Sequence, residues 1–138
     1  MKLKYRILQN QRLYSVFQAL MLEKMPLKAA YKMKRFADKL DQETKSYHTF
    51  MQDALKKYAE LDEKGNPVIE FQGEGEEKTP VGYKLKDSAT FNKEAEDFLE
   101  TEFEVEVNPL YASELEEVKI APVDLVVMEP FIADINNI

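Results

Sequence analysis

Three glutamates in the C-terminal third of the chain have the side chains for acid–base chemistry or metal binding. Glu102, Glu104 and Glu106 alternate with Phe103, Val105 and Val107. Carboxylates act as general acids or bases, or hold Mg²⁺, only where the fold brings them together in a pocket. Strict alternation instead predicts a half-buried strand whose carboxylates point in parallel toward solvent. We therefore interpret them as an acidic face that could bind a partner, with metal binding or catalysis as the weaker alternative.

A row of basic side chains is the second candidate. At about 100° per residue, Lys28, Lys32, Arg35 and Lys39 fall within a helical sector of about 60°, opposite Ala30, Met33, Ala37 and Leu40. Such a row can follow phosphates or contact an acidic protein surface. An ordinary surface helix also needs a polar face. Of the two binding roles we favour contact with an acidic protein over nucleic acid.

The remaining residues offer little chemistry. The chain has no Cys and one His, His48, which lies among polar residues and which we interpret as solvent-facing. None of the four Gly residues precedes a Lys-Ser or Lys-Thr pair, so no phosphate-binding Gly-rich loop is present. Segment 62–66 lacks the acid spacing of a calcium loop and is interpreted as a turn. We therefore predict no catalytic, cofactor-binding or metal-ligating residue, no cofactor and no enzymatic activity.

Charge is distributed unevenly along the 138 residues. The formal net charge is −7, but residues 1–65 carry 14 Lys and Arg against 8 Asp and Glu, whereas residues 66–138 carry 5 against 18. The basic half can attract the acidic half, within one molecule or between molecules. Binding to nucleic acid is thereby disfavoured for the acidic half alone.

The basic half is predicted to be a helical hairpin. After a short alternating segment at 3–7, apolar residues at helical spacing indicate a helix from Asn10, its predicted N-cap, to Lys24. Pro26 interrupts this helix and begins a second one that extends to about Asp62. Residues 41–46 are all polar, so this second helix is either continuous over about 37 residues, roughly 55 Å, or restarts near Asp41. A helix that long favours an elongated protein with a partner chain.

The acidic half is predicted to contain a small antiparallel sheet with short helices. Segments 68–71 and 81–85 indicate a β-hairpin around an acidic loop, and a helix follows from Asp87 or Ser88 to about Glu102. The strand at 103–107, a helical turn at 113–118 and a helix at 122–128 complete it. The expected fold is α+β. Residues 1–138 are expected to form a single domain, which is large enough to bury a hydrophobic core without disulfides or bound metal ions.

Membrane spans and leader segments are not expected. The longest uncharged apolar-rich run near the start, residues 13–22, is about half of the roughly 20 residues that a span needs. No apolar stretch with a small-residue cleavage site follows the first basic residues. We expect a protein that works in the compartment where it is made.

The order of these segments resembles a family of small tailed-bacteriophage proteins of uncharacterised function. The resemblance rests on residues 25–31 at the helix corner, on Tyr58, Ala59 and 62–66 at the turn, and on 121–125 with 129–131. These are turn and core patterns without a chemical motif. The resemblance implies a phage origin and no enzymatic activity.

The expected function is protein–protein interaction, in a virion structural component or an assembly factor. Its partners would be copies of itself or other phage proteins, in the host cytoplasm or the virion. The alternative is an inhibitor of a host nucleic-acid-acting defence enzyme, whose acidic strand and 74–77 loop imitate phosphates.

Overall fold

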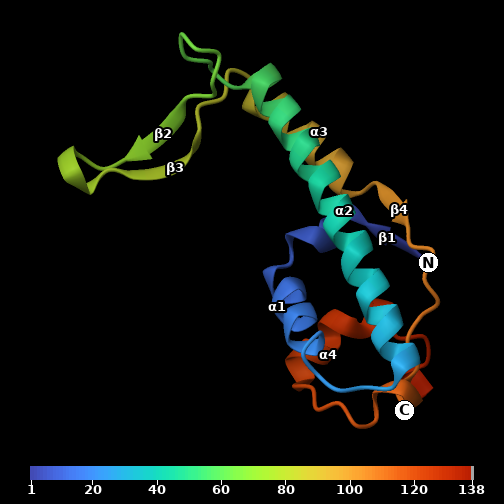
Figure 1. Cartoon of the computed structure of the whole chain (residues 1–138). Coiled ribbons are helices and arrows are strands. Elements are labelled where there is room, and N and C mark those ends of the chain that lie inside the picture. Colours follow the sequence, from blue (N-terminus) through green and yellow to red (C-terminus); the bar gives the residue numbers. More distant parts are fainter. Residues whose placement is uncertain (138) are drawn as a thin grey trace. The chain divides into compact units, whose positions relative to one another are not determined.

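The computed structural model describes residues 1–137 and has α+β architecture (Figure 1). The chain divides into two compact units, each described by itself below. Unit 1 consists of Met1–Thr44 together with the segment from Glu100 onward, and unit 2 consists of Lys45–Leu99. The boundary between the units therefore differs from the charge boundary at residue 65.

Helix α2 is one continuous helix of 32 residues, Leu27–Tyr58, about 48 Å long. The polar stretch at 41–46 is helical, so the continuous alternative is the correct one. The helix ends four residues before the predicted end, because the next residues turn to extended pairing. Ala59 pairs with Leu85, and Leu61 pairs with Pro67, in isolated antiparallel bridges.

Unit 1 begins with a three-residue strand and a short helix. Strand β1 (Lys2–Lys4) pairs antiparallel with β4 (Glu102–Glu104), with Leu3 opposite Phe103. The alternating segment at 3–7 is therefore strand only at its start, and it continues as a 3-10 helix, Tyr5–Gln9. Helix α1 (Gln11–Leu20) is capped as predicted by the Asn10 side chain, which accepts a hydrogen bond from the Arg12 backbone N–H at 3.1 Å. It ends at Leu20 rather than at Lys24.

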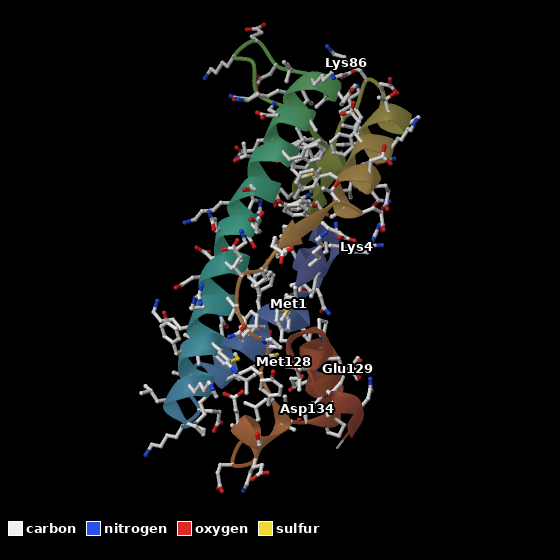
Figure 2. The ribbon with its side chains drawn as sticks, turned by 90° about the vertical axis from the view of Figure 1, so that its right-hand side faces the viewer. Met1, Lys4, Lys86, Met128, Glu129 and Asp134 are labelled. Atoms are coloured by element: carbon white, nitrogen blue, oxygen red, sulfur yellow. The ribbon has the colours of Figure 1, made fainter. Side chains whose placement is uncertain are left out.

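The core of unit 1 is an aromatic and aliphatic cluster. The ring of Phe131 contacts Phe17 and Phe36 edge-on, at centroid distances of 5.2 and 5.1 Å. Helix α4 (Pro122–Met128) packs against α1 and begins with proline at its first position, as predicted. Met128 points from α4 into this core, whereas Glu129 lies on the outside (Figure 2).

Unit 2 combines the second part of α2 with a β-hairpin and helix α3 (Ser88–Leu99). The Phe50 ring on α2 stacks on Phe98 of α3 at 4.1 Å. Strands β2 (Ile69–Gln72) and β3 (Thr79–Tyr83) form the predicted hairpin, with a bulge between Glu70 and Phe71. The described residues thus form two separate two-stranded sheets, because β4 pairs with β1, whereas β2 pairs with β3. Neither face of the hairpin is covered by a helix of unit 2 (Figure 1).

Candidate interaction surfaces

The predicted basic row lies along α2, but its members have different surroundings. Lys28 and Arg35 are exposed, Lys39 is half-buried and Lys32 is 5% exposed. The expectation of a row facing outward is therefore wrong at Lys32. The buried face of the helix contains Ala29, Met33, Phe36 and Leu40. Its centre lies about 50° closer to Lys32 than the predicted face, which omitted Phe36.

Lys32 is held by a network within unit 1. Its ammonium lies 2.8 Å from Glu114 Oε1, donates to the Pro109 carbonyl at 2.9 Å and sits 4.9 Å from the centre of the Tyr111 ring. Both side chains of the ion pair are largely withdrawn from solvent. Because removal of either partner leaves a buried charge uncompensated, this pair holds α2 against the segment around residue 111.

The partner Glu114 is positioned by its own backbone. It lies in a 3-10 helix, Ala112–Leu115, and the same Oε1 accepts a hydrogen bond from the Tyr111 N–H at 3.0 Å. The start of this helix is fixed by Asp134, whose carboxylate accepts from the Ala112 N–H at 2.8 Å. The second oxygen of Glu114 is buried and accepts no hydrogen bond from the part of the chain that the structure describes. The contacts of Lys32 and Glu114 therefore stabilise unit 1 and leave neither side chain available to a partner.

Arg35 and Lys39 are also used inside unit 1. Arg35 donates to the Glu106 carbonyl at 3.1 Å, and Lys39 pairs with Glu43 at 2.8 Å. Glu43 in turn accepts a short hydrogen bond from the Tyr5 hydroxyl. Burial and this hydrogen bond raise the pKa of Tyr5 to about 12. Burial alone would raise the pKa of Glu43, but the hydrogen bonds from Lys39 and Tyr5 and the Lys39 charge outweigh it and lower that pKa.

The predicted acidic row has the expected alternation. Glu102, Glu104 and Glu106 are exposed, and Phe103, Val105 and Val107 between them are buried. However, β1 places cations beside the row, because Lys2 lies opposite Glu104 and Lys4 opposite Glu102 in the antiparallel register. The outer face of this small sheet therefore carries both signs of charge and is a poor imitation of a phosphate backbone.

Four of the seven predicted interaction residues line one groove. Arg35 and Lys39 on α2 face Glu104 and Glu106 across a polar groove of about 520 Å³. The structure does not bring Lys28 or Glu102 to this groove, and Lys32 lies in the network described above. Because both cations and carboxylates line it and Lys39 pairs with Glu43, the groove can hold polar contacts but presents no single sign of charge to a partner.

Two surfaces that sequence reasoning missed expose large apolar side chains. The first is on the hairpin, where Ile69, Phe71, Val81 and Tyr83 are each 45–56% exposed. Between the strands, Gly73 and Gly75 adopt the positive φ values that other residues rarely reach, and Glu74 and Glu76 are exposed there. Together with Glu70 we call these residues the hairpin patch. The alternation of Ile69 and Phe71 with Glu70 is the signal that could have marked it.

The second surface lies where α1 connects to α2, and we call it the corner patch. Leu22 and Leu27 are each 87% exposed and Tyr31 is 62% exposed. Although Leu27 is apolar, it does not belong to the buried face of the helix, because it lies nearly opposite the buried Ala29, Met33 and Phe36. Lys24 and Lys28 complete the patch, and neither pairs with a carboxylate within residues 1–137.

Three further observations concern metal binding, the single histidine and membrane crossing. Across residues 1–137, no three acidic or histidine side chains come together where they could hold a metal ion. His48 is exposed on α2, with its ring 6.0 Å from that of Tyr47. Over the same range no helix is both long and apolar enough to cross a bilayer.

Comparison of the chain with models of protein families, with curated proteins and with solved structures found no match. The resemblance to tailed-phage proteins thus stays an expectation. The two apolar patches and the charges around them are therefore the features of the molecule that bear on its function.

Proposed function

We propose that this chain is a non-enzymatic bacteriophage protein that acts through protein–protein contacts, as a structural component of the virion or as an assembly factor. Under this proposal its partners are copies of itself or other phage proteins. It works in the host cytoplasm or in the particle, without a cofactor, and it binds neither nucleic acid nor membrane.

The observation that carries the proposal is the exposure of large apolar side chains in both units. More than half of the residue surface is exposed at Leu22 and Leu27 in unit 1, and the same is true of Phe71 and Val81 in unit 2. Single exposed apolar residues are ordinary, but groups of them mark surfaces that another protein covers. The basic row, in contrast, is used mainly within the fold, which weakens any role in binding a polyanion.

The proposal is tested on gradient-purified particles of the phage that encodes the chain. Mass spectrometry should detect the protein in a fixed ratio to the major capsid protein in particles or in their assembly intermediates. A non-structural protein of the same phage, followed in the same fractions, is the control for contamination. Absence from both particles and intermediates would contradict the proposal.

One observation favours the second candidate, an inhibitor of a host nucleic-acid-acting enzyme. Glu70, Glu74 and Glu76 on the hairpin make no ion pair among the described residues, so their charge is available to a basic active site. Such an inhibitor should bind one host enzyme in a stoichiometric complex that weakens as salt is added. The variant Glu74→Gln/Glu76→Gln should then lose inhibition, whereas Glu116→Gln/Glu117→Gln should retain it.

A further inference from the structure

We propose that the hairpin patch of one copy docks on the corner patch of a second copy, so that the protein assembles head to tail. This inference rests on the proposed function, because it names the partner as another copy of the same chain and assigns the two surfaces that meet.

The apolar content of the two patches suits a protein interface. Phe71 and Tyr83 on the hairpin and Tyr31 on α2 are aromatic residues of the kind that dominates interface energetics when they become buried. Leu22 is shared between the corner patch and a neighbouring apolar groove of about 550 Å³ between α1 and α2. This groove offers space for an aromatic side chain of the partner beside the patch.

The charges around the patches are opposite. Segment 69–83 contains four Glu and one Lys, whereas segment 21–35 contains five Lys or Arg and one Glu. Glu74 and Glu76 at the end of the hairpin and Lys24 and Lys28 in the corner patch lack partners within the described chain. A cross-contact between the patches therefore brings free carboxylates to free ammonium groups, around an apolar centre.

Self-pairing of either patch is disfavoured. Two hairpins placed edge to edge would bring the Glu side chains of one copy near those of the other, and like charges in that position are destabilising. Pro80 also removes one backbone donor from the edge of β3. Two corner patches in contact would likewise bring Lys24 and Lys28 of one copy near the same residues of the other. Because both symmetric pairings repel, the charges select the heterologous contact.

A heterologous contact leaves one hairpin patch and one corner patch free at the ends of each assembly. Further copies can then add until the ring closes, or they continue as a filament. This gives the assembly a property that self-pairing of either patch lacks, which is that variants defective on different patches complement each other.

Complementation is the decisive experiment, read by size-exclusion chromatography with light scattering at micromolar concentration. The wild-type protein should form oligomers, while Phe71→Asp and Leu27→Asp should each be monomeric with an unchanged circular dichroism spectrum. An equimolar mixture of the two variants should form a dimer and nothing larger, because only one intact hairpin patch and one intact corner patch remain per pair. A wild-type monomer, a variant that still oligomerises alone, or a mixture without dimers would overturn the inference.

Charge exchange provides a second measurement that does not depend on apolar variants. Glu74→Lys/Glu76→Lys and Lys24→Glu/Lys28→Glu should each weaken association by roughly tenfold or more, and mixing these two variants should restore it. The matched controls Glu116→Lys/Glu117→Lys and Lys64→Glu/Lys119→Glu change the net charge equally at exposed sites outside both patches. Equal weakening by the controls, or no recovery on mixing, would contradict docking between the patches.

The outcomes separate this inference from the proposed function. A protein that is present in phage particles but stays monomeric as purified chain would retain the proposed function and reject head-to-tail docking. A protein that assembles with complementation but is absent from particles and their intermediates would retain head-to-tail docking and reject the proposed function.

Discussion

The Lys32 network in unit 1 and the hairpin in unit 2 use similar residue types in opposite ways. Around Lys32, charged groups are withdrawn from water, and the ammonium has a carboxylate, a carbonyl and a ring within contact distance. On the hairpin, Phe71 and Tyr83 remain about half exposed and the neighbouring glutamates have no partner among the described residues. Polar groups are thus buried in one region while apolar groups are exposed in the other.

This difference shows which surfaces are complete within one chain. The buried ion pair is satisfied by residues separated by more than eighty positions in the sequence, so it needs no partner protein. A two-stranded hairpin without a packed face is marginally stable by itself in water, and its apolar side chains are the ones that gain from a partner. The candidate binding surface is therefore the hairpin rather than the charged row.

The largest effect on stability is expected for Phe131→Ala. This ring is completely buried between Phe17 and Phe36, and its removal leaves a cavity in the core of unit 1. The free energy of unfolding should fall by about 3–5 kcal/mol, measured by urea denaturation followed by circular dichroism.

Phe71→Ala is the matched control on the hairpin. Because its ring is half exposed in the single chain, the change in the free energy of unfolding should stay within about 0.5 kcal/mol when it is measured at a protein concentration too low for association. Equal losses at Phe131 and Phe71 would mean that the hairpin is covered within the chain, and the comparison between the two regions would fail.

A slightly smaller loss is expected for Lys32→Ala. The substitution leaves the Glu114 carboxylate buried without its cation, which should lower the free energy of unfolding by about 3 kcal/mol. Lys28→Ala, on the same helix but exposed and unpaired among the described residues, should change it by less than about 0.5 kcal/mol.

A double variant distinguishes the lost ion pair from lost packing. Lys32→Met/Glu114→Met replaces both charges with apolar groups and should recover most of the loss, because well-packed apolar residues can substitute for a buried pair. If the double variant is as unstable as Lys32→Ala, the uncompensated charge is not the cause.

Much of the fold follows from local sequence signals. The α+β class, the long helix, the hairpin, the Asn10 cap and the helix that starts at Pro122 are set by periodicity, capping residues and proline, which act over a few residues. The end of α2 is different, because Tyr58 is followed by bridges to Leu85 and Pro67, and such non-local pairing is invisible to a helical period.

The site could be predicted only in part, for the same reason. The exposure of Glu102, Glu104 and Glu106 follows from alternation, but the lysines opposite Glu102 and Glu104 come from β1, which lies far earlier in the chain. The burial of Lys32 depends on Glu114, which a helical wheel cannot include. The exposure of Leu27 and Leu22 depends on where the core of unit 1 lies. Their apolar type alone would indicate burial, whereas both are exposed.

The third prediction concerns pH and the hydrogen bond between Tyr5 and Glu43. Burial and that bond raise the pKa of Tyr5 from 10.0 to about 12, so the folded state retains a proton that the unfolded state loses. The stabilisation is complete below pH 10 and is lost as the pH rises toward 12. Tyr5→Phe should lower the free energy of unfolding by about 1.5 kcal/mol near neutral pH. The difference from wild type in the free energy of unfolding should then shrink above pH 10.

The hairpin again supplies the control for this measurement. Tyr83→Phe removes a hydroxyl from a half-exposed side chain, and its difference from wild type in the free energy of unfolding should be near zero at neutral pH. On the acid side the sign is reversed, because the pKa of Glu43 is lowered in the folded protein. Its contribution is present above the ordinary glutamate pKa of 4.5 and is lost as the pH falls further. A wild-type to Tyr5→Phe difference that does not change above pH 10 would contradict the proposed linkage.

The smallest effect is expected at Glu100, although two cations converge on it. Lys4 and Arg6 lie 2.7 and 2.8 Å from its two oxygens, and their hydrogen bonds lower the pKa of this carboxylate. Its side chain is 48% exposed, so water and salt screen both pairs. Glu100→Gln should therefore destabilise the protein less than Phe131→Ala, Lys32→Ala or Tyr5→Phe, and the loss should diminish further in high salt. A loss larger than that of Lys32→Ala would mean that the number of ion pairs, and not their burial, determines which charges hold unit 1 together.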